Sequence, residues 1–69
     1  MSRKEELIAW FKAFGAVTLK AKAVADDKLG IDFLDSIGSD ALLLAQKIEA
    51  GEGLSMEDAE SDYITMRDL

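Results

Sequence analysis

The sequence contains no cysteine, no histidine and no proline. The absence of cysteine excludes disulfides, thiolate metal sites and a cysteine nucleophile. The absence of histidine removes the usual general base and the commonest transition-metal ligand. We therefore expect a protein that is not an enzyme and that holds no metal ion.

Clusters of basic residues and long apolar runs are also missing. The net charge is −6, and the eight basic residues are dispersed along the chain, so we expect no binding to nucleic acid. No apolar run approaches the roughly 18 residues that a membrane span needs, and the N-terminus has no signal-peptide core. These features predict a cytoplasmic protein that makes no contact with a membrane.

The pattern of apolar residues is helical throughout. Proline, which interrupts helices, is absent, and β-branched residues form no alternating run. No linker or internal repeat divides the 69 residues. We therefore predict an all-α fold, a small bundle of three to four helices, in a single domain that spans residues 1–69.

The first helix is predicted to begin after Ser2, a typical N-cap with Glu5 three residues later, as in a capping box. Its apolar face contains Leu7, Trp10, Phe11 and Phe14. Two ends are possible. The helix stops near Gly15 and gives way to a loop, or it continues to about Asp27 with a glycine that costs about 1 kcal/mol inside it. The periodicity slightly favours the longer helix.

A second helix is predicted over residues 37–50, with Asp35, Ser36 or Ser39 as its N-cap. Its apolar positions are Ile37, Ala41, Leu44, Ala45 and Ile48, and Leu42 and Leu43 widen them into a broad surface typical of a central helix. Gly51 and Gly53 should end it, one of them in the left-handed conformation.

A third helix is predicted after Ser55, its N-cap, with Glu57 and Asp58 in the first turn, where the helix dipole favours them. It either runs unbroken over residues 56–68 or breaks near residues 61–62 before a last turn.

The serine at position 36 has a distinctive context, 34-LDSIGS-39. This stretch resembles the modification motif of the acyl, peptidyl and D-alanyl carrier protein superfamily. In that family an amphipathic helix and a long loop precede the motif, a recognition helix follows it, and a short acidic helix comes next. The order and spacing of residues 3–17, 34–39, 37–50 and 55–61 are similar.

The resemblance implies a function and a cofactor. Ser36 would carry a phosphopantetheine arm, and Asp35, Ile37 and Met56 would line the surface presented to the modifying and acyl-transferring enzymes, with Asp40 an acidic residue of the recognition helix. Carrier domains have a loop before the motif, whereas residues 17–29 have a helical pattern. The structure of residues 15–28 therefore discriminates between this hypothesis and others.

The alternative is a non-catalytic three-helix interaction module, a regulator or assembly factor that is oligomeric. It would bind partners through the face formed by Leu7, Trp10, Phe11 and Phe14, of which Trp10 and Phe14 are the candidate contacts. The same aromatic pattern is typical of a core. A calcium-binding loop is excluded, because the aspartates between residues 26 and 35 lack the required register.

Overall fold

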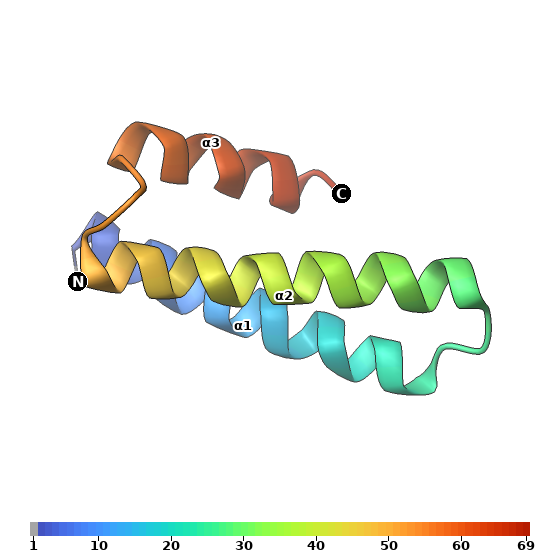
Figure 1. Cartoon of the computed structure of the whole chain (residues 1–69). Helices are drawn as coiled ribbons and strands as arrows, with labels where there is room; N and C mark the ends of the chain where they lie inside the picture. Colours follow the sequence, from blue (N-terminus) through green and yellow to red (C-terminus); the bar gives the residue numbers. More distant parts are fainter. Residues whose placement is uncertain (1) are drawn as a thin grey trace.

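A computed structural model describes residues 2–69 of the chain. It contains three helices, α1 (Arg3–Val24), α2 (Lys28–Ala50) and α3 (Met56–Arg67), and no strand within those residues. Helices α1 and α2 form a long antiparallel hairpin, and α3 lies along one side of it (Figure 1). The prediction of an all-α bundle is confirmed, with three helices.

Helix α1 passes through Gly15 without a break, as the longer of the two predictions required, and ends at Val24. Gly15 is buried where α1 crosses α2. A Cβ atom there would lie 2.8 Å from Leu42 Cγ and 3.1 Å from the carbonyl oxygen of Gly38. Gly38 is placed reciprocally, with its hypothetical Cβ 2.8 Å from Leu19 Cγ. The two glycines allow close approach of the helix backbones, and neither of them ends a helix.

Helix α2 begins at Lys28, nine residues before the predicted start at residue 37. The N-cap is Asp27, whose Oδ1 accepts a hydrogen bond of 3.1 Å from the Gly30 amide. The prediction that Asp35, Ser36 or Ser39 caps the helix was therefore wrong. Those three residues are exposed on the solvent side of α2. Ile31 and Leu34, which are half-buried, continue the apolar face of the helix toward its N-terminus.

The other helix ends match their sequence signals. The Ser2 hydroxyl accepts a hydrogen bond from the Glu5 amide, and the Ser55 hydroxyl accepts one from the Asp58 amide. Gly51 has a φ of 70° and caps α2 in the left-handed region, as predicted. Helix α3 continues through residues 61–62, so the unbroken alternative is confirmed.

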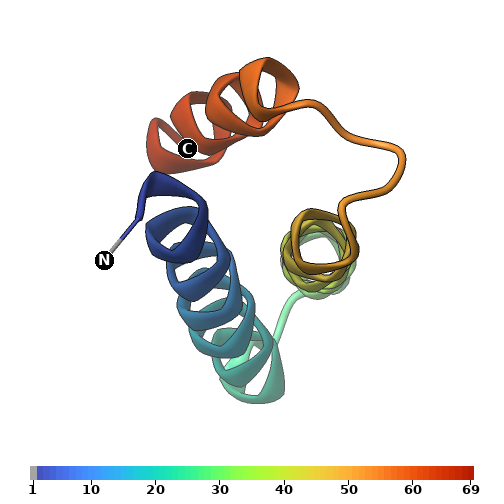
Figure 2. The same cartoon turned by 90° about the vertical axis from the view of Figure 1, so that its left-hand side faces the viewer.

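The core lies in one half of the hairpin. Its buried members come from all three helices: Leu7, Phe11, Ala41, Ala45, Ile48 and Ala59. This half, formed by residues 3–14 and 40–50 together with α3, is called the covered half below. In the end-on view, α3 completes a triangle with α1 and α2 (Figure 2).

Helix α3 has 12 residues against the 23 of α2, so it covers only part of the hairpin (Figure 1). Near its end, Thr65 and Met66 share a shallow pocket of about 270 Å³ with Asp40 and Leu44 of α2. Residues 15–24 of α1 and 28–39 of α2 extend past α3, and they are called the open half.

Candidate functional site

The open half exposes large apolar side chains on the side of the hairpin that α3 covers elsewhere. On α1, Trp10, Val17 and Val24 are spaced by seven residues, close to two helical turns, and so lie along one side of the helix. Trp10 packs against Tyr63 of α3. Val17 and Val24 lie on the same side beyond the end of α3, with 67% and 84% of their surfaces exposed.

Helix α2 contributes a matching row. Phe33 lies seven residues before Asp40, which borders α3, and Leu29 lies one turn before Phe33. Leu29 is 82% exposed and Phe33 is 54% exposed. Val17, Val24, Leu29 and Phe33 are called the open face below. They are exposed apolar side chains on two neighbouring helices, in the part of the hairpin that no third helix of the described chain covers.

Aspartates border the open face. Asp40 lies at its α3 end, Asp26 lies at the hairpin tip, and Asp32 lies on the outer edge of α2 one turn before Ser36. All three are exposed, and none forms an ion pair with another described residue. Lys20 is the counterpart on the α1 edge. The border of the open face is therefore predominantly acidic.

The covered half is held together by aromatic and ionic contacts between α1 and α3. Trp10 stacks on Phe14, with ring centroids 4.9 Å apart, and meets the Tyr63 ring edge-to-face at 4.8 Å. The Arg3 guanidinium lies over the Tyr63 ring, 5.0 Å from its centroid. These contacts fix the position of α3 on the hairpin.

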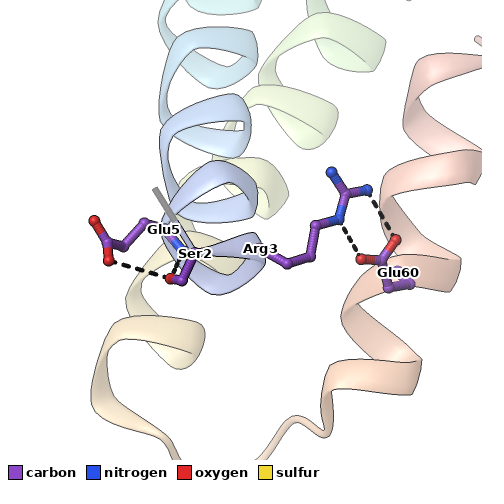
Figure 3. Close-up of polar contacts among 4 residues, drawn as sticks. All are labelled: Ser2, Arg3, Glu5 and Glu60. Carbon is purple, nitrogen blue, oxygen red and sulfur yellow. Dashed lines mark hydrogen bonds and ion pairs between the residues drawn. The ribbon is translucent and has the colours of Figure 1, made fainter.

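Arg3 also forms a two-pronged ion pair with Glu60 of α3 (Figure 3), in which Nη2 lies 2.9 Å from Oε2. The hydrogen bonds from Arg3 lower the pKa of the Glu60 carboxyl, and the same bonds raise the pKa of Arg3. In the same view Ser2 and Glu5 form the cap of α1.

The residues of the LDSIGS stretch lie in the interior of α2. Ser36 is exposed on the ninth residue of the helix, and Asp35 forms an ion pair with Lys22 of α1, with Nζ 2.7 Å from Oδ1. The segment before the motif is helix up to Val24 and again from Lys28, where the resemblance implied a loop.

The structure separates some predicted site residues and brings others together. Met56 begins α3 beside the C-terminal end of α2 (Figure 1), whereas Ser36 lies 14 residues before that end, about 20 Å away at the rise of a helix. Ile37 is half-buried, and Asp40 lies on the α3 side of the helix. Asp40 thus borders the open face, while Met56 does not belong to it.

The aromatic face predicted for partner binding is internal. Leu7 and Phe11 are completely buried, and Trp10 and Phe14 are half-buried against the core. The open face was not singled out in the sequence. Val17 and Val24 continue the helical apolar pattern of residues 7–14 and so resemble core positions, whereas Phe33 lies outside the helices predicted from the sequence.

Within residues 2–69, no group of three or more acidic side chains is arranged to hold a metal ion. None of the described helices is long and apolar enough to cross a membrane. No family model, curated protein or solved structure matches the chain.

Proposed function

We propose that the protein is a non-catalytic protein–protein interaction module and that the open face is its binding surface. The observation that supports this proposal is the concentration of Val17, Val24, Leu29 and Phe33 on one side of the hairpin, each more than half exposed. Contiguous exposed apolar surface on a small protein is characteristic of interaction sites, whereas singly scattered apolar residues are not.

The hairpin does not need the open face for its own packing. Helices α1 and α2 meet through glycine and other small residues, among them Gly15, Gly38 and Ala41, all of them buried. We call this contact between α1 and α2 the seam. The side chains of the open face lie beside the seam, so their exposure does not disturb its packing. Their exposure is therefore compatible with a stable fold that offers them to a partner.

Site-specific photo-crosslinking tests the proposal. A photoreactive phenylalanine analogue is placed at Phe33, or at Ile64 of α3 as the control, since Ile64 is 47% exposed and lies outside the open face. In cells that produce the protein, we expect a discrete adduct from position 33 that disappears in the Val24→Ser background. Equal labelling from positions 33 and 64 would contradict the proposal.

A carrier function is the second candidate, because the Ser36 hydroxyl is exposed and can be reached by a modifying enzyme. The position of Ser36 inside α2 favours the first proposal. To attach an arm, the enzyme would have to accept a serine within a regular helix, without the free amide groups of a helix start. Intact mass after incubation with coenzyme A and a phosphopantetheinyl transferase separates the two candidates. A carrier gains one arm, and its Ser36→Ala variant gains none.

A further inference from the structure

We infer that the partner of the open face is an amphipathic helix of about three turns with basic residues along one flank, lying on the hairpin in line with α3. This inference rests on the proposed function, and it adds the shape and charge of the ligand. It follows from the way α3 itself is bound, from the length of hairpin that α3 leaves open, and from the aspartates around the open face.

Helix α3 shows what the hairpin accepts on this side. It contributes Ala59, Tyr63 and Met66, at spacings of four and three residues, to the surface between α1 and α2. The same sides of α1 and α2 continue past the end of α3 and bear Val17 and Phe33. A second helix with apolar residues at the same spacings would therefore meet the same kind of surface.

The space available sets the length of the ligand. Helix α3 ends beside Asp40, and residues 28–39 of α2 remain uncovered. Twelve residues of α2 correspond to about 18 Å, or just over three helical turns. A longer helix would extend past the tip formed by residues 25–27, where α1 turns into α2.

The charges bordering the open face select a basic flank. Asp32 lies on the outer edge of α2, Asp40 lies at the α3 end of the open face, and Asp26 lies at the tip. Lys28 lies seven residues before Asp35, on the opposite edge of α2, and Lys22 is paired with Asp35. Lys20 is a cation on the α1 edge of the border. Lysines or arginines along the α2 side of the ligand would meet Asp32 and Asp40.

A second copy of the chain fits the open face less well. Because α3 occupies one end of this side in both copies, two open faces can meet in a symmetric pair only with their tips pointing in opposite directions. That arrangement lays α2 against α2, so that Asp32 lies near Asp32 of the other copy and Asp40 lies near the other copy's tip, where Asp26 is. The net charge of −6 on each chain opposes the association further.

Fluorescence anisotropy with two synthetic helical peptides tests the inference. Both peptides carry leucines at three- and four-residue spacing on an alanine-rich helix, and they differ only in having lysine or glutamate along one flank. We expect the lysine peptide to bind the whole chain and the glutamate peptide to bind about tenfold more weakly, with a difference that shrinks as salt is added.

Variants locate the bound peptide. Phe33→Ser should weaken binding of the lysine peptide by about tenfold or more, because it removes an apolar anchor. The double substitution Asp32→Asn and Asp40→Asn should weaken binding of the lysine peptide severalfold and reduce the salt dependence of binding. Ile64→Ser should leave binding unchanged. The substituted residues are exposed, so we expect the helices to stay intact, and circular dichroism of each variant checks this.

Three results would overturn the inference. They are no binding of the lysine peptide, equal binding of the two peptides, and binding that Phe33→Ser leaves intact. Sedimentation that reveals a dimer abolished by Phe33→Ser would identify a second copy as the ligand, against the inference. In that case a discrete photo-adduct at position 33 would still support the proposed function, so the two failures are distinguishable.

Discussion

The two halves of the hairpin are built from the same pair of helices and differ in what lies on their third side. In the covered half, α3 completes the core, and Leu7 and Phe11 are fully buried. In the open half, equally apolar residues such as Val24 and Leu29 are more than four-fifths exposed. The comparison separates apolar residues that stabilise the fold from apolar residues that remain available for binding.

The open half keeps its structure without a third helix because the helices approach closely there. Gly15 and Gly38 face each other across the seam, and Leu42 and Leu19 pack over them. Buried Thr18 satisfies its hydroxyl within α1 by donating a 2.6 Å hydrogen bond to the Phe14 carbonyl. Packing of this kind replaces some of the burial that α3 provides in the covered half.

Truncation of one phenylalanine in each half should give the largest contrast. Phe11→Ala removes a fully buried ring from the core, and we expect a loss of about 3–5 kcal/mol in the free energy of unfolding. Phe33→Ala should change it by no more than about 1 kcal/mol, because that ring is more than half exposed. Urea unfolding followed by circular dichroism measures both, and similar losses would refute the distinction between the halves.

Adding a methyl group at the seam should have an intermediate effect. In Gly38→Ala the new Cβ meets Leu19, and we expect a net loss of about 1–2 kcal/mol, since overpacking outweighs the gain in helix propensity. The neighbouring Ser39→Ala is the control, because Ser39 is exposed and its replacement should be neutral or slightly stabilising. A stabilised Gly38→Ala protein would contradict the close approach of the helices.

The smallest expected effect concerns the ion pair that ties α3 to α1. Arg3 lowers the pKa of Glu60, so the pair contributes stability above the ordinary carboxyl value of 4.5 and loses it as the pH falls through the lowered pKa. The difference in unfolding midpoint between the wild type and Glu60→Gln should therefore be present at neutral pH and vanish in acid. Asp62→Asn is the control on the same helix, and a difference that persists unchanged in acid would exclude this role.

Much of the covered half could be predicted from the sequence. Ser2, Gly51 and Ser55 signalled helix ends through local chemistry that the structure uses directly, and the spacing of Leu7 and Phe11 marked the core face. These features depend on residues within one or two turns of each other. Local signals of this kind can be read without knowledge of the tertiary structure.

The open half could not be predicted in the same way. Asp35, Ser36 and Gly38 are residues typical of a helix start. Gly38, however, is needed because α2 packs closely against α1 at Gly15, which lies 23 residues earlier in the chain. The sequence also does not distinguish Val24 from a core residue, because its exposure depends on where α3 ends. The start of α2 and the exposure of Val24 both depend on long-range packing, which the spacing of apolar residues along the sequence does not reveal.

The most direct test of this account is the urea unfolding midpoint of the Val24→Ser/Phe33→Ser variant and of the wild type, measured over a wide range of protein concentration. Serine has nearly the helix propensity of valine and phenylalanine, so we expect the two free energies of unfolding to differ by no more than about 1 kcal/mol. We expect both midpoints to be independent of protein concentration. A variant destabilised by several kcal/mol would place the open face in the core. A midpoint that rises with concentration for the wild type and not for the variant would mean that a second copy already covers the open face.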